Sequence, residues 1–261
     1  MARLTNICVT WVLLSIMLTH SVFAVQETSL LLNLPGQNVD QINAANGSCV
    51  QYQGSACQAG NFSTTNPIGI KFPALNPPRV KIATTSMSGS QSINQNKGTL
   101  SFDYTTLSTE QSDWGKPLNN QARIKTLFKW GDTAQQFQVI IYNDGVKSYL
   151  VFRHDATNNC TGSACQRSVS TSRYETGDSK IVMGWKPAEK HQITVSWNFR
   201  TPAEGNSSMG IYIDGKYAIV ETKSSSINSD GFYQPSMYLG ADHQGGNPAQ
   251  GIIGNFKIYS D

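Results

Sequence analysis

Residues 137–152 read FQVIIYNDGVKSYLVF. Two runs rich in β-branched and aromatic residues flank Asn143-Asp144-Gly145, and glycine accepts the positive φ that a tight hairpin turn needs. The pattern returns at residues 209–220, where Asp214-Gly215 separates two similar runs. The sequence therefore predicts two antiparallel β-hairpins.

Further strands are predicted on both sides of these hairpins. Polar and apolar residues alternate over residues 99–104, 124–130 and 191–197, and two β-rich segments follow at residues 236–240 and 251–259. Several short strands with turn signals between them are typical of an all-β sandwich or closed barrel, and we expect a sandwich of two antiparallel sheets. Trp130 and Trp197 fit the alternation and are predicted to be buried.

The first residues have the layout of a secretory signal peptide. Arg3 precedes an uncharged apolar run, and Val22 and Ala24 place short side chains three residues and one residue before the expected cleavage point. We expect a signal peptide at residues 1–24 and a single domain at residues 25–261. A membrane anchor is the alternative, but polar residues dilute the run. We therefore expect a secreted protein, extracellular or periplasmic, without a membrane span after cleavage.

The N-terminal part of the mature chain is predicted to be loop-rich. Residues 37–78 abound in Asn, Gly, Ser and Pro and hold too few apolar residues for a core of their own. We expect a long loop there, stapled by a disulfide, with strands at residues 30–34 and 80–82 at its ends.

Four cysteines remain once Cys8 leaves with the signal peptide. They form two close pairs, Cys49 with Cys57 and Cys160 with Cys165. An even number of cysteines in an exported protein indicates disulfides, and local pairing is favoured because each pair closes a short, flexible loop. Zinc is the alternative, and neither the spacing nor a nearby histidine supports it.

The composition argues for an uncharged partner. Only 14% of residues are charged and the net charge is +3, spread along the chain. Without a basic stripe, a nucleic-acid partner is not expected. The abundance of Asn, Gln, Ser, Thr and Gly suits a hydroxyl-rich partner, such as a glycan or a glycosylated surface.

The ordered segments from residue 98 to residue 261 resemble the concanavalin A-like lectin/glucanase superfamily and, within it, the laminin-G-like domains. The matching segments are residues 99–104, 127–132, 191–197, 209–216, 237–241 and 251–259. The resemblance implies a jelly roll of two curved antiparallel sheets. It also implies calcium at the loop rim, for which Asp132, Asp144 and Asp242 are candidate ligands; no other cofactor is expected.

Lectins, adhesion modules, glycoside hydrolases and polysaccharide lyases share this fold, so the fold leaves the function open. The Glu-x-Asp-x-x-Glu strand of the glucanases is absent. A lyase needs a Tyr or His to move a proton and an Arg, Asn or Gln to neutralise a carboxylate; these residue types are present, but the Arg-Thr-Glu and Gln-Ile-His motifs of jelly-roll alginate lyases are not. We expect a secreted carbohydrate-binding or surface-recognition module without catalytic activity. The alternatives are a polysaccharide lyase and an adhesion protein that binds a protein partner.

The ligand is predicted to bind at loops between strands, because loops carry function on a rigid scaffold. Trp114 and Trp185 lie in turn-like sequence and are expected to be exposed. A polar, glycine-rich stretch between the last two strands adds Tyr238, Asp242 and His243. These five residues form the predicted binding site, and no catalytic residue is assigned.

Overall fold

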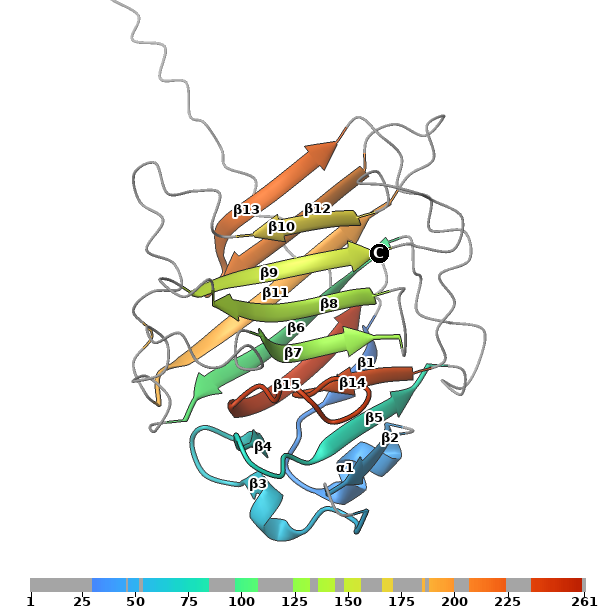
Figure 1. The fold of residues 1–261 in the computed structure, drawn as a ribbon, viewed down its shortest axis with the longest axis vertical. Helices are drawn as coiled ribbons and strands as arrows, with labels where there is room; N and C mark the ends of the chain where they lie inside the picture. Colours follow the sequence, from blue (N-terminus) through green and yellow to red (C-terminus); the bar gives the residue numbers. More distant parts are fainter. Residues whose placement is uncertain are drawn as a thin grey trace, which may run out of the picture.

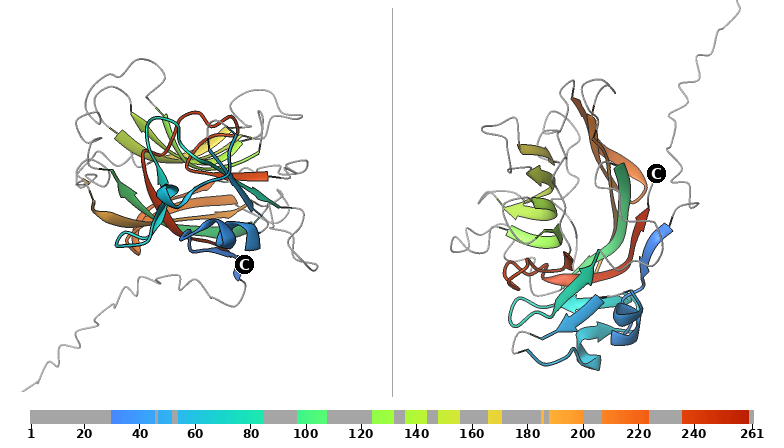
Figure 2. Two further views of the ribbon diagram at one scale, coloured as in Figure 1. Left: turned by 90° about the horizontal axis from the view of Figure 1, so that it is seen from below. Right: turned by 90° about the vertical axis from the view of Figure 1, so that its right-hand side faces the viewer.

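The computed structural model is a jelly-roll sandwich of two antiparallel β-sheets, seen face-on in Figure 1 and from two further sides in Figure 2. It describes residues 30–45, 47–51, 54–84, 97–107, 124–131, 136–143, 148–155, 166–170, 185, 188–199, 207–223 and 236–259. The predicted signal peptide lies outside these residues. In the described part, no helix is long and apolar enough to cross a membrane.

Sheet A has the strand order β13-β12-β11-β6-β15-β4-β3, and β1 pairs with the last residues of β15. Its strands are β1 (Leu30–Leu34), β3 (Phe62–Ser63), β4 (Gly69–Phe72), β6 (Lys97–Thr106), β11 (Lys190–Asn198), β12 (Ser207–Ile213), β13 (Lys216–Lys223) and β15 (Gly251–Tyr259).

Sheet B has the order β10-β9-β8-β7-β14-β5-β2 and lies in front of sheet A in Figure 1. Its strands are β2 (Gly47–Val50), β5 (Arg79–Ala83), β7 (Ile124–Trp130), β8 (Gln136–Asn143), β9 (Ser148–Asp155), β10 (Gln166–Ser170) and β14 (Ser236–Leu239).

Aromatic side chains join the two sheets across the core. Phe137 of β8 meets Trp197 of β11 at a centroid distance of 4.7 Å, and Phe128 of β7 meets Phe256 of β15 at 5.6 Å. All four are at most 2% exposed, as is Trp130. The predicted burial of Trp130 and Trp197 is therefore confirmed. These side chains mark the inner face of each sheet, and the residues that alternate with them along a strand point outward.

The predicted strands are present, and the hairpin at residues 209–220 is β12–β13. Its turn residues Asp214 and Gly215 have φ of 53° and 69°, the left-handed conformation that this turn requires. Residues 137–152 form the antiparallel pair β8–β9, whose connection at residues 144–147 lies outside the described part. Strand β10 was not predicted, because its sequence QRSVS has no clear alternation.

The prediction of a long loop over residues 37–78 is wrong. This segment contains helix α1 (Val39–Ala44), a 3₁₀ turn at Ala59–Asn61, and strands β2, β3 and β4. The helix begins at Asn38, whose side chain accepts a hydrogen bond from Gln41 N, and it buries Ile42 completely. The segment needs no core of its own because its strands extend the two sheets: β2 pairs with β5 of sheet B, and β4 pairs with β15 of sheet A.

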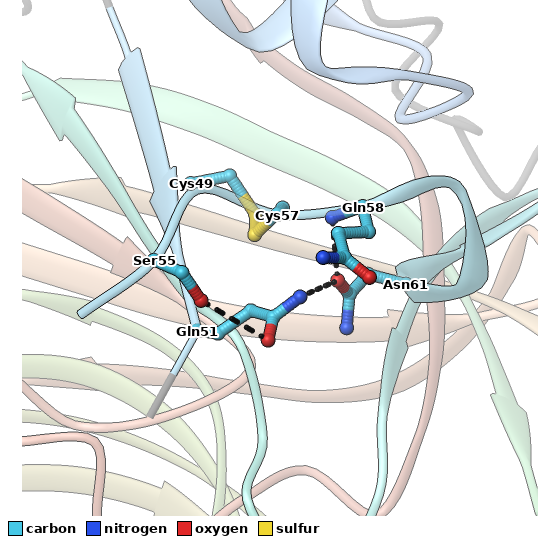
Figure 3. Close-up of a disulfide and its surroundings, with 6 residues drawn as sticks. All are labelled: Cys49, Gln51, Ser55, Cys57, Gln58 and Asn61. Atoms are coloured by element: carbon cyan, nitrogen blue, oxygen red, sulfur yellow. Dashed lines mark hydrogen bonds between the residues drawn. A yellow bond between two sulfur atoms is a disulfide. The ribbon is translucent and has the colours of Figure 1, made fainter. Parts of the chain in front are cut away.

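The predicted disulfide Cys49–Cys57 is confirmed (Figure 3). Its Cα atoms are 5.4 Å apart, and Cys57 N donates to Cys49 O. Polar side chains brace the same turn, because Gln51 Nε2 donates to Asn61 Oδ1 at 3.3 Å and Ser55 Oγ donates to Gln51 Oε1 at 3.3 Å. The predicted pair Cys160–Cys165 lies outside the described residues.

Replacing both Cys49 and Cys57 by alanine should lower the free energy of unfolding by about 2–3 kcal/mol, because the bridge closes only a short loop. The sandwich should stay folded, since its core is built from other residues. Urea unfolding followed by far-ultraviolet circular dichroism measures the change. Loss of cooperative unfolding in the double variant would contradict this peripheral role.

Candidate active site

A row of polar side chains crosses the outer face of sheet B. The strand register places Arg153 (β9), Gln138 (β8), Lys129 (β7), Tyr238 (β14) and Lys81 (β5) directly beside one another. Side chains that are paired in this way lie on the same face of the sheet. We call these five residues the cross-strand row.

The buried neighbours of the row show that its side chains point away from the core. Lys129 stands between Phe128 and Trp130, and Gln138 follows Phe137; these aromatic residues face the core. Successive side chains of a strand point to opposite faces, so the polar residues point away from sheet A. The centre of the row is nevertheless secluded, with Lys129 5% and Tyr238 4% exposed, whereas the end residues Arg153 and Lys81 are half-buried.

The charged side chains described on the outer face of sheet B are cationic. Among the side chains that the structure describes, its strands place Arg79, Lys81, Lys129 and Arg153 there and no Asp or Glu. On sheet A, by contrast, the Lys190 ammonium lies 3.3 Å from the Asp103 carboxylate. The charge of sheet B is therefore suited to an anionic ligand.

A tight loop at residues 240–250, the dark red loop in front of β14 in Figure 1, brings His243 onto Lys129 and Tyr238 at the centre of the row. Asp242 organises the loop. Its Oδ1 accepts hydrogen bonds from Gln244 N at 2.9 Å and Gly246 N at 2.7 Å, and its Oδ2 accepts from Asn247 Nδ2 at 3.2 Å. The carboxylate thus holds the turn that presents His243.

Backbone bonds tie this loop to an irregularity in β7. The register with β8 shifts between Thr126 and Phe128, and a bulge of this kind re-aims the chain locally. Leu127 O accepts from Gly240 N at 3.0 Å, and Thr126 N donates to Asn247 O at 2.8 Å. Both ends of the loop are therefore fixed to the strand that carries Lys129.

His243 is held by residues from three strands. Its Nδ1 lies 3.1 Å from Lys129 Nζ, its ring meets Tyr238 edge-on at a centroid distance of 6.5 Å, and its carbonyl oxygen accepts from Arg79 Nη1 at 3.3 Å. An ammonium group only donates, so Nδ1 accepts through its lone pair and Nε2 carries the ring hydrogen. The half-buried imidazole thus presents a basic nitrogen beside a cation and a phenol.

This arrangement combines two chemical capacities. Lys129, Arg153 and the Gln138 amide can bind a carboxylate through charge and hydrogen bonds. The imidazole of His243 and the phenol of Tyr238 can accept and donate protons next to that carboxylate. A cation beside a proton acceptor can bind a carboxylate and remove a proton from the carbon atom next to it.

Replacing Asp242 by alanine should loosen the loop and reduce the free energy of unfolding by about 1–3 kcal/mol, because Gln244 N and Gly246 N lose a charged acceptor. The imidazole signals of His243 in nuclear magnetic resonance spectra should broaden. Asp242→Asn is the matched control, since it keeps one acceptor oxygen and should have the smaller effect. Equal, negligible effects of both changes would contradict this role.

The structure brings three of the five predicted site residues together, namely Tyr238, Asp242 and His243. Trp185 was expected to be exposed, and this is wrong. It is 7% exposed, stacks on His191 at a centroid distance of 4.2 Å and contacts Tyr104 of β6. Its aromatic face is used for packing on sheet A. Trp114 lies outside the described residues.

The calcium expectation rested on three aspartates, of which Asp132 and Asp144 lie outside the described residues. The Asp242 carboxylate accepts hydrogen bonds from its own loop, and calcium binding stays a prediction. Within the described part of the chain, no three His, Cys, Asp or Glu side chains gather as metal ligands would.

The sequence analysis missed most of the cross-strand row. A signal for it was available, because each of three consecutive strands carries one long polar residue directly after a buried phenylalanine: Lys129 after Phe128, Gln138 after Phe137, and Arg153 after Phe152. Sequence alone did not show that strand register would align them.

No protein-family model matches this sequence, and neither does any curated protein. Solved structures match at low similarity. The binding domain of Paraclostridial Mosquitocidal Protein 1 is 14% identical with a TM-score of 0.47; the match covers 89% of this chain and 49% of that one, so this chain spans about half its length. The endo-beta-1,4-glucuronan lyase of the fungus Trichoderma reesei is 9% identical with a TM-score of 0.43, over 89% of this chain and 96% of that one. A marine alginate lyase from Aplysia kurodai is 10% identical with a TM-score of 0.44, over 89% and 100%.

Most of these structural neighbours are polysaccharide lyases. This finding overturns the expectation of a module without catalytic activity.

Proposed function

We propose that the chain is a polysaccharide lyase that cleaves a uronate polymer by β-elimination on the outer face of sheet B. The observation that carries the proposal is the position of His243, whose Nδ1 lies 3.1 Å from Lys129 Nζ beside Tyr238. These three residues supply a cation, a proton acceptor and a proton donor at one point on a cationic face.

In β-elimination, a base removes the proton from C5 of a uronate, the carbon that carries the carboxylate. The electron pair of that C–H bond forms the C4=C5 double bond, and the bond between C4 and the glycosidic oxygen breaks. The leaving oxygen takes a proton from a general acid. The products are one chain with a new hydroxyl and one with an unsaturated sugar at its end.

Lys129 is assigned to the carboxylate of the reacting uronate. Negative charge builds up on this carboxylate as the C5 proton leaves, and a fixed ammonium group stabilises that charge most where water is excluded. Lys129 is 5% exposed, which meets this condition. Gln138, its cross-strand neighbour, is positioned to donate a hydrogen bond to the same group.

His243 is assigned as the base and Tyr238 as the acid. C5 is bonded directly to the carboxylate carbon, so a base beside the carboxylate-binding lysine lies close to the C5 proton. As the Lys129 ammonium turns from Nδ1 to the carboxylate, the lone pair of Nδ1 is released and takes the C5 proton. Tyr238, which pairs with Lys129 across the strands and contacts the imidazole, is assigned to protonate the leaving oxygen.

Export fits the same picture. The disulfide Cys49–Cys57 suits an oxidising compartment, and the sequence predicts a signal peptide at residues 1–24. A polymer-degrading enzyme meets its substrate outside the cell. Membership of the superfamily of concanavalin A-like lectins and laminin-G-like domains, which the sequence resembles, is part of this proposal.

The test is incubation of the mature chain with alginate, glucuronan and polygalacturonate while the ultraviolet absorbance of the unsaturated product is recorded. At least one polymer should give steady product formation that stops in the Tyr238→Phe and Lys129→Ala variants. Neutral β-glucan is the control and should give none. Product formation that persists unchanged in both variants would refute this assignment of the site.

A further inference from the structure

His191 lies at the start of β11, on the inner face of sheet A. Ile193, Val195 and Trp197 follow it at every second position and are buried, so the imidazole points to the same side as these core residues. Its ring stacks on Trp185 at a centroid distance of 4.2 Å and an angle of 18°. The side chain is 10% exposed, and the ring is therefore held in one orientation.

Asp214 determines which ring nitrogen of His191 carries a hydrogen. Its Oδ2 lies 2.8 Å from His191 Nδ1, and an ionised carboxylate only accepts, so Nδ1 is the donor. Asp214 is itself held in place, because its Oδ1 accepts from Gln192 N at 2.8 Å and its own N donates to Gln192 O at 2.9 Å. The lone pair of the imidazole is therefore on Nε2.

Nε2 of His191 is buried and has no hydrogen-bond partner among the residues that the structure describes. The atom that faces it is Glu189 Oε2 at 3.7 Å, which is too far for a hydrogen bond. A lone pair and a carboxylate oxygen that face each other repel unless a cation lies between them. A buried polar atom without a partner is costly, and native structures leave few of them.

We propose that His191 Nε2 and the Glu189 carboxylate bind a divalent transition-metal ion of the zinc class. Zinc binds nitrogen and carboxylate oxygen at about 2.0–2.2 Å, so two ligand atoms of a tetrahedral site lie about 3.3–3.5 Å apart. A small rotation of the Glu189 side chain, which is 46% exposed, would reduce the observed 3.7 Å to this separation. Water can complete the coordination from the exposed side.

The bond from His191 Nδ1 to Asp214 supports this assignment. Histidines that bind metals commonly donate their second ring nitrogen to a carboxylate, which fixes the tautomer and orients the ring. Because two protein ligands take part, we expect weaker binding than at a closed structural zinc site. The ion would fasten Glu189 to β11 on the inner face of sheet A, whereas the candidate active site lies on the outer face of sheet B.

Titration calorimetry of the mature chain with Zn²⁺ tests the inference, together with the Tm at increasing Zn²⁺ concentration. The Tm should rise with Zn²⁺, because the ion binds the folded chain, and a chelator should reverse the rise. Asp214→Asn tolerates the positive φ of 53° but can turn an amide N–H toward Nδ1, which moves the ring hydrogen to Nε2. This variant should weaken zinc binding about 10–100-fold, and Glu189→Gln should also weaken it.

Asp40→Asn is the matched control, since Asp40 is an exposed carboxylate on α1, and it should bind Zn²⁺ like the parent. His243→Ala should also keep the parental zinc affinity. The proposal is wrong if Zn²⁺ does not bind, as expected of a site that takes up a proton only. It is equally wrong if Asp214→Asn and Glu189→Gln retain the parental affinity, or if His243→Ala abolishes binding. None of these results depends on cleavage of a polysaccharide, so the test is independent of the proposed function.

Discussion

Replacing His243 by alanine should lower the turnover of the uronate polymer by about two to four orders of magnitude, the usual contribution of a positioned general base. His243 is the side chain whose Nδ1 accepts from Lys129 and whose ring meets Tyr238. The fold should be unaffected, because Asp242 and backbone bonds to β7, rather than the imidazole, hold the loop. Kinetics of product absorbance give kcat and KM separately, and kcat should carry the loss.

The neighbouring Gln244 offers a matched control for this variant. It lies on the same loop and is exposed, and only its backbone N–H contacts Asp242. Gln244→Ala should keep the parental kcat. A His243→Ala variant that is folded and turns over substrate as fast as Gln244→Ala would exclude His243 as the base.

Replacing Trp197 by alanine should lower the free energy of unfolding by about 3–5 kcal/mol, because it opens a cavity between the sheets. Trp197 is 2% exposed and meets Phe137 at 4.7 Å and Phe152 at 6.5 Å, both from sheet B. Its ring also packs against Gly98, where an added Cβ would come within 2.7 Å of it. Urea or thermal unfolding measures the loss.

Thr194 lies on the same strand and points to the outer face of sheet A. Thr194→Ala should lower the free energy of unfolding far less, since it removes one hydrogen bond between the Thr194 and Ser101 hydroxyls. Trp185→Ala should also destabilise the domain, because Trp185 is buried against His191. A Trp197→Ala variant as stable as Thr194→Ala would contradict the account of the core.

Period-two alternation was sufficient to predict most of the sandwich. In β11, for example, Ile193, Val195 and Trp197 are buried and the residues between them are not, so one strand reveals its own inner face. The turn at Asp214-Gly215 was predictable for a similarly local reason, the need for positive φ. Strand β10 and the strands within residues 37–78 were missed because non-local pairing, rather than their own pattern, stabilises them.

The candidate site was predictable only in its loop. A glycine-rich stretch between two strands drew attention to Tyr238, Asp242 and His243, yet the role of Asp242 as the acceptor for its own loop depends on a turn geometry that spacing does not reveal. Lys129 and Lys81 lie 48 residues apart in sequence (129 minus 81) and share a row only because both pair with Tyr238. Register of this kind is a property of the assembled sheet.

The central claim is that the site on the outer face of sheet B cleaves a uronate polymer by β-elimination, and does not hydrolyse it or only bind it. Nuclear magnetic resonance of the new chain ends in a digest tests it most directly. The account predicts ends with a C4=C5 double bond in the digest made by the unsubstituted chain, and no new ends with Lys129→Ala. Saturated ends, or intact polymer after prolonged incubation with every uronate tested, would contradict it.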